Sequence, residues 1–125
     1  MLNRVLWFEI YVTDLDRAQK FYEAAFDISL NRQEMMGVDM AWFPMGETEG
    51  ELDPGAPGTL IKMDEISPSK DGSVVYLHVA DIDATLAKIE AAGGKMLVPK
   101  TNIGKHGSIA HFEDTEGNRV ALHMA

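Results

Sequence analysis

Apolar and polar positions along the chain change period in a fixed order, and that order occurs twice. Residues 7–12 and 74–79 are rich in β-branched, aromatic and aliphatic side chains, which is typical of β-strands. Apolar residues then recur at helical spacing, most clearly at Ala18, Phe21, Tyr22, Ala25 and Phe26. Three further strand-like segments follow in each half, at about 28–35, 39–45 and 58–64, and at 95–100, 108–114 and 118–124. The pattern therefore predicts the order βαβββ, twice.

Both predicted helices have recognisable start signals, and the second has a clear stop signal. An aspartate able to cap free N–H groups stands at each start, Asp14 or Asp16 in the first half and Asp81 or Asp83 in the second. The run 91–94, Ala-Ala-Gly-Gly, ends the second helix, because glycine readily adopts the left-handed conformation found there.

The two halves also match residue by residue. Val12 corresponds to Val79, and Glu23 to Glu90, at a constant offset of 67 positions. The offset changes later because the first half contains a longer acidic loop, residues 46–58, which we expect to be solvated or to form a lid. The repeat predicts one α+β domain over residues 1–125, made of halves at about 1–65 and 72–125.

A βαβββ unit buries one sheet face under its helix and leaves the other uncovered, so two such sheets side by side can curl into an open cup. Alternation directs Phe8, Ile10 and Val12 towards the helix, and Trp7, Glu9 and Tyr11 towards the cup. In the second half the residues predicted to face the cup are Val74, Tyr76, His78, Arg119, Ala121 and His123. An aromatic concavity with scattered polar groups is typical of a small-molecule site.

The amino-acid composition excludes several classes of binding partner and site. The net charge of −9 argues against nucleic acid, because phosphate recognition needs clustered Lys and Arg. No apolar run approaches the length of a membrane-spanning helix, and the N-terminal residues do not resemble a signal peptide, so we expect a cytoplasmic protein. The absence of cysteine excludes disulfides, thiolate metal sites and a cysteine nucleophile.

Glu9 is the leading catalytic candidate, with His78 and His111 as further candidates. A carboxylate between Trp7 and Tyr11 would be partly desolvated, and desolvation raises a carboxyl pKa towards that of a useful general base. The alternative is that Glu9 pairs with Arg119 or another cation across the sheet. The sequence favours the ion pair.

Six residues are candidates for ligand binding: Trp7, Tyr11, Trp42, Tyr76, Arg119 and His123. The two tryptophans could stack a planar ligand, and Tyr76 could donate a proton or a hydrogen bond. Aromatic side chains in small domains are also core residues, and for Trp42 the two interpretations are equally supported.

The paired halves, the stretch "FEIYVTDLDRAQKFYEAAF" and the turn "HFEDTEGNRVALH" together resemble the vicinal oxygen chelate superfamily. This superfamily includes glyoxalase I, extradiol dioxygenases and the bleomycin- and fosfomycin-resistance proteins. The resemblance covers nearly the whole chain and is greatest to the glyoxalase-like branch without an assigned reaction. It implies the paired βαβββ fold, a small-molecule ligand and pairing into homodimers.

In metal-using members of the superfamily, ligands stand on the first and last strand of each half. The corresponding residues here are Trp7, Ile61, Val74 and Ala121, none of which can bind a divalent metal. We therefore predict no metal at the family positions and no other cofactor. A displaced site made of Glu9, His78, His111 and His123 is a less favoured alternative; the side on which His111 lies is open.

Three functions follow from these residues. The first is a glyoxalase-like lyase or isomerase that works without the usual metal ligands. The second is a metal-independent protein that binds or sequesters a small molecule, as bleomycin-resistance proteins do, and the third is an accessory domain without a free ligand. The sequence favours small-molecule binding, leaves the reaction open, and does not decide whether the cup forms within one chain or between two.

Overall fold

A computed structural model describes residues 4–44 and 55–125. The first half contains β1 (Phe8–Tyr11), α1 (Leu15–Phe26), β2 (Asn31–Met35), β3 (Val38–Trp42) and β4 (Gly58–Ile61). The second half contains β5 (Tyr76–His78), α2 (Ile82–Ala91), β6 (Lys95–Asn102), the short 3₁₀-helix η1 (Gly104–His106), β7 (Ser108–Glu113) and β8 (Arg119–Met124). The prediction of βαβββ in each half is confirmed, with η1 as an additional turn.

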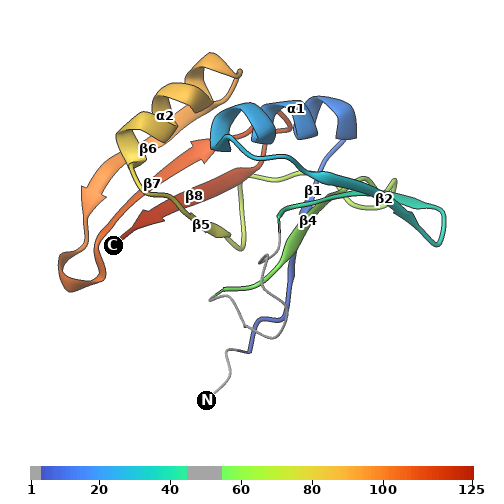
Figure 1. Ribbon diagram of the computed structural model, residues 1–125, viewed down its shortest axis with the longest axis horizontal. Coiled ribbons are helices and arrows are strands. Elements are labelled where there is room, and N and C mark those ends of the chain that lie inside the picture. Colours follow the sequence, from blue (N-terminus) through green and yellow to red (C-terminus); the bar gives the residue numbers. More distant parts are fainter. Residues whose placement is uncertain (1–3, 45–54) are drawn as a thin grey trace.

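The strands form two separate four-stranded sheets. Their orders are β1-β4-β3-β2 and β5-β8-β7-β6, so the first and last strands of each half lie side by side and parallel. Both helices lie on one side of the sheets, α1 over the first and α2 over the second. No described helix or strand lies on the opposite sheet faces, which are called the uncovered faces below (Figure 1). This is the predicted α+β architecture, with sheets that do not close into a barrel.

One core serves both halves. The predicted stripe of α1 is buried against residues from both sheets, including Leu60 and Phe112, while α1 and α2 also contact each other. Tyr22 stacks on Phe26 and meets Phe43 and Phe112 edge-on, with ring centroids 5.6 to 6.4 Å apart. Burial of these aromatic side chains stabilises the packing of the two halves against each other.

The predicted facing of β1 is confirmed. Ile10 and Val12 are buried towards the helices, whereas Trp7 is 60% exposed and Glu9 is exposed on the uncovered face. In β8, Val120 and Leu122 belong to the core as predicted, and Ala121 between them is buried as well. Most of the predicted loop 46–58 lies outside the described residues.

The turn between β7 and β8, residues 114–118, connects the two halves. The Tyr22 hydroxyl of α1 donates to a carboxylate oxygen of Asp114 over 2.7 Å, and the Asn118 side chain donates to the Tyr11 carbonyl over 2.8 Å. Asp114 also accepts from the backbone N–H groups of Glu116 and Asn118. Burial raises the pKa of Asp114 despite these hydrogen bonds, and it raises the pKa of Tyr22 strongly.

Glu116, in the same turn, binds the start of α1. Its carboxylate accepts from the backbone N–H groups of Thr13 and Asp14, from the Thr13 hydroxyl, and from the Arg17 guanidinium at 2.7 Å. The Glu116 side chain has no exposed surface. Burial alone would raise the pKa of Glu116, but the hydrogen bonds from Arg17 and the backbone outweigh it and lower that pKa to about 2.

Within the described part of the chain, no helix is long and apolar enough to cross a membrane.

Candidate functional site: the uncovered sheet faces

The uncovered face of the first sheet carries an aromatic cavity of about 480 Å³. Trp7 precedes β1, and Trp42 lies in β3, where it pairs with Thr59 of β4 and Asn31 of β2. Both tryptophans line the cavity, together with Phe43, Asn31 and Gln33. The volume lies within the range of small-molecule pockets, and the mixture of aromatic rings with two amides is typical of them.

Trp42 contributes a polar group to this region that lacks a partner. Its indole N–H is buried and is the only buried side-chain donor or acceptor among the described residues that has no hydrogen-bond partner. Buried polar groups in native proteins are almost always satisfied by protein, water or ligand. The sequence left open whether Trp42 belongs to the core or to a ligand site. The unpaired N–H favours the ligand site.

Glu9 lies on the same face and pairs within its own strand. Its carboxylate accepts a hydrogen bond from the Tyr11 hydroxyl over 2.9 Å. Burial, and then the bond and charge of Glu9, raise the pKa of Tyr11. The ion pair with Arg119 that the sequence favoured is not formed, because Arg119 binds a histidine on the other sheet.

The uncovered face of the second sheet carries a connected polar cluster: Tyr76 of β5, His111 of β7 and Arg119 of β8. The Tyr76 hydroxyl lies 3.0 Å from Nε2 of His111, and Nη1 of Arg119 lies 3.0 Å from Nδ1 of the same ring. The rings of Tyr76 and His111 meet edge-on with centroids 5.6 Å apart. The facing of His111, which the sequence left open, is thus towards the uncovered side.

The donors in this cluster determine the protonation of His111. A guanidinium has only donors, so Nδ1 must accept from Arg119 and cannot carry a proton. The ring is therefore neutral with its proton on Nε2, which then donates to the Tyr76 oxygen. Partial burial and the nearby Arg119 charge both lower the pKa of His111, consistent with a neutral ring.

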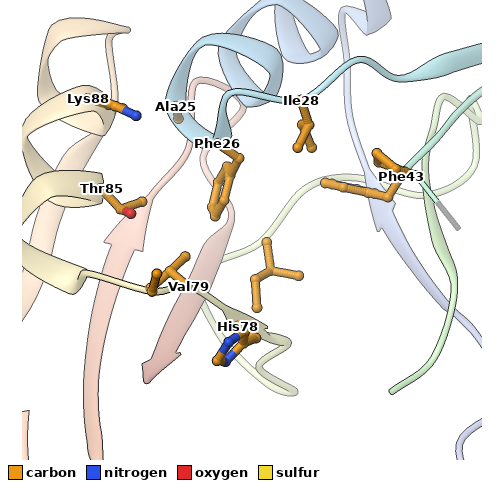
Figure 2. Close-up of a pocket in the computed structure, with 11 residues that line it drawn as sticks. Ala25, Phe26, Ile28, Phe43, His78, Val79, Thr85 and Lys88 are labelled. Atoms are coloured by element: carbon orange, nitrogen blue, oxygen red, sulfur yellow. The ribbon is translucent and has the colours of Figure 1, made fainter. Parts of the chain in front are cut away.

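The remaining histidines lie elsewhere. His123 donates from Nε2 to the carbonyl of His106 over 2.6 Å, which ties the end of β8 to η1. His78 lines a separate groove of about 430 Å³ between the halves, with Phe26 and Phe43 on the opposite wall and Lys88 and Thr85 of α2 nearby (Figure 2). The sequence did not distinguish this groove from the cup.

The four residues of the displaced metal site are not brought together. Glu9 binds Tyr11, His111 binds Tyr76 and Arg119, His123 binds a backbone carbonyl, and His78 lines the groove. Across residues 4–44 and 55–125, no three His, Asp or Glu side chains converge in a geometry able to hold a metal ion. Of the residues at the four family positions, Ile61 and Ala121 are buried and Trp7 lines the aromatic cavity.

Comparison with known sequences identifies the family. The sequence model of the Glyoxalase/Bleomycin resistance protein/Dioxygenase superfamily matches residues 4–122. The chain belongs to this superfamily. A glyoxylase-like domain-containing protein of Didymella fabae is 31% identical over 115 residues, which are 91% of this chain and 88% of that protein.

Solved structures show the same fold. A glyoxalase/bleomycin resistance protein from Albidiferax ferrireducens superposes with a TM-score of 0.73 at 17% identity, covering 98% of this chain and 99% of that one. TnmS3, an antibiotic-binding protein from Streptomyces sp. CB03234, superposes with a TM-score of 0.65 at 23% identity, covering 98% and 96%. The resemblance to the superfamily seen in the sequence is confirmed, and so is its fold.

Several residues on the uncovered sheet faces were not identified as site residues from the sequence. Asn31 and Gln33 line the aromatic cavity, and Lys70 supports Arg119 by accepting its Nε–H at the backbone carbonyl over 3.3 Å. Strand alternation in β2 could have indicated Asn31 and Gln33. Nothing in the local sequence indicates Lys70, because a loop places it there.

Proposed function

We propose that this superfamily member binds a planar, largely apolar small molecule without a metal ion, in the cavity between Trp7 and Trp42. The observation that carries the proposal is the cavity itself, in which two indole rings and two amides line about 480 Å³. Trp7 and Ile61 stand at two of the four positions where the resemblance would require a metal ligand. At the first of these positions the indole ring of Trp7 can stack on a ligand, whereas it cannot coordinate a metal ion.

The side chains that line the cavity indicate which chemical groups a ligand should carry. Aromatic rings favour a flat ring system, and the amides of Asn31 and Gln33 each offer both donors and an acceptor at its edge. A ligand acceptor that reached Trp42 Nε1 would also satisfy that buried donor. Structural similarity to the antibiotic-binding TnmS3 supports binding as a use of this fold.

Intrinsic fluorescence tests the proposal at the site itself. The chain has two tryptophans, and both line the cavity, so any change in indole emission reports on this region. We expect a neutral planar aromatic probe such as quinoline to change the emission saturably and to raise the melting temperature, both with and without EDTA.

Matched variants make the test specific. Trp7→Ala should weaken quinoline binding at least tenfold. Met36→Ala, at a fully exposed side chain in the turn between β2 and β3, should leave it unchanged. Binding that needs added zinc, nickel, manganese or iron would contradict metal independence. Equal binding by Trp7→Ala and the parent protein would place the ligand elsewhere.

A second candidate is an enzyme of the lyase or isomerase type, favoured by the exposed Glu9–Tyr11 pair on the same face as the tryptophans. Glu9 would act as general base and Tyr11 would orient it. Glu9→Gln should abolish turnover of a substrate while retaining its binding. A cytoplasmic location and homodimerisation stay predictions, and sedimentation of the purified protein tests the second.

A further inference from the structure

Strand register places three residues in one row across the second sheet. Ala121 of β8 is the direct partner of Tyr76 on β5 and of His111 on β7. Tyr76 and His111 are therefore two strand spacings apart, about 10 Å between backbones. Their side chains meet because the methyl group of Ala121, which is fully buried, leaves the space above it free.

The hydrogen bonds leave one proton without a partner. Arg119 occupies Nδ1 of His111, so Nε2 is the donor towards Tyr76 and the Tyr76 oxygen is the acceptor. The hydroxyl proton of Tyr76 is then free to donate to something outside the cluster. Tyr76 is 48% exposed, so that donor is accessible from the uncovered sheet face.

The charge beside this donor is positive. Lys70 forms an ion pair with Glu113 at 3.3 Å, and Arg119 forms none with any described carboxylate. Arg119 therefore lies beside the neutral His111 with no described ion pair to balance its charge. A half-buried guanidinium without a counterion is unusual in a chain whose net charge is −9.

We propose that Tyr76 and Arg119 form a binding site for a carboxylate group of a small ligand, with His111 as the positioning residue that holds the Tyr76 hydroxyl in its donating orientation. The Tyr76 O–H and the remaining guanidinium N–H groups supply the donors, and both bond types are strong towards an anionic oxygen. The site is independent of the tryptophan cavity, since it lies on the other sheet.

The first experiment reads the histidine directly. In ¹⁵N-histidine-labelled protein, long-range ¹H–¹⁵N spectra should show His111 as the neutral Nε2–H tautomer at pH 7. In Arg119→Gln the charge next to Nδ1 is lost, so His111 should titrate at higher pH than in the parent protein. A doubly protonated or Nδ1–H ring in the parent protein would overturn the arrangement.

The second experiment measures carboxylate binding with benzoate as the probe and benzyl alcohol as its uncharged control. Benzoate should shift the His111 and Tyr76 resonances saturably, and benzyl alcohol should bind at least tenfold more weakly. Tyr76→Phe and Arg119→Gln should each weaken benzoate binding at least tenfold, with the parent protein's dispersed spectrum retained. Benzoate shifts confined to other residues, or unchanged affinity in Tyr76→Phe, would refute the site.

Two more variants separate positioning from simple packing. His111→Gln can still accept from Arg119 and donate to Tyr76, so it should keep most of the benzoate affinity, whereas His111→Leu should lose it. Trp7→Ala should leave benzoate affinity unchanged while it weakens quinoline binding at least tenfold. Loss of both ligands in Trp7→Ala would show a single shared site and overturn the independence of the two.

Discussion

The two halves of the chain have the same fold, but the starts of their helices differ. In both, an aspartate caps the helix: Asp14 accepts from the Arg17 N–H at 3.0 Å, and Asp81 accepts from the Ala84 N–H at 3.1 Å. Among the described residues, a second carboxylate reaches only the first helix, and it is that of Glu116 from the opposite half. The repeat therefore sets how each half folds, and its departures from symmetry set how the halves dock.

The uncovered faces differ in a similar way. On the first sheet Trp7 and Trp42 line a cavity, and the buried indole N–H of Trp42 has no hydrogen-bond partner among the described residues. On the second sheet His111 binds Tyr76 across Ala121 and binds Arg119 at its other ring nitrogen, which leaves the Tyr76 hydroxyl proton free to donate. The first face offers aromatic surface on which a ligand ring can stack, and the second offers hydrogen-bond donors in fixed directions. The two halves of the repeat therefore carry surfaces of different chemistry.

The largest expected loss of folding stability comes from removing the contact between the two halves that Glu116 makes. Glu116→Ala leaves the N–H groups of Thr13 and Asp14 and the Arg17 guanidinium without their partner, so it should cost about 3 kcal/mol of unfolding free energy. Urea unfolding measures this. Glu90→Ala is the control, since Glu90 is exposed and accepts one backbone bond, and it should cost under about 1 kcal/mol. Equal costs would show that Glu116 does not hold the halves together.

Tyr22→Phe should come next, at about 2 kcal/mol, because it removes a hydrogen bond to the buried Asp114 carboxylate. Its counterpart in the repeat is Ile89, which is equally buried but apolar. Ile89→Val should cost about 1 kcal/mol through lost packing alone. Thermal unfolding of both variants makes the comparison, and a smaller loss for Tyr22→Phe than for Ile89→Val would contradict it.

Acid sensitivity should follow from Glu116. Its pKa in the folded protein is about 2, below the ordinary value of 4.5, so its stabilising contribution is complete above 4.5 and is lost as the pH falls towards 2. The raised pKa of Asp114 acts in the opposite direction, because its contribution is present at low pH and lost as the pH rises. Urea midpoints from pH 6 to 2 should therefore fall less steeply in Glu116→Gln than in the parent protein; parallel curves would refute the assignment.

The smallest expected loss of folding stability comes from removing the helix caps, which both halves have. Asp14→Ala and Asp81→Ala each remove one capping bond and should each cost about 1 kcal/mol. Similar losses in chemical denaturation would place the difference between the halves in Glu116 rather than in the caps. A much larger loss for Asp14→Ala would instead make the first cap part of the contact between halves.

Local pattern predicted more of the fold than of the site. Alternation placed Trp7, Glu9 and Tyr11 on the uncovered face, and helical spacing found the buried stripe of α1, because both depend on residues close in sequence. The partner of Glu9 was not predictable: the favoured Arg119 lies on the other sheet, and the actual partner is Tyr11. Whether Arg119 can reach Glu9 depends on how the two sheets are placed, which alternation within one strand leaves open.

The sequence by itself determined the duplicated βαβββ order, the capped helix starts and the absence of metal-binding side chains at Trp7, Ile61, Val74 and Ala121. These follow from residue chemistry and from periods of two and 3.6 residues. Only the tertiary structure decided that Glu116 reaches α1, and that Tyr76, His111 and Arg119 meet above a small side chain. The physical reason is distance along the chain, since Glu116 is 103 positions from Thr13 and Tyr76 is 35 positions from His111, and such residues meet only when sheets and helices are assembled.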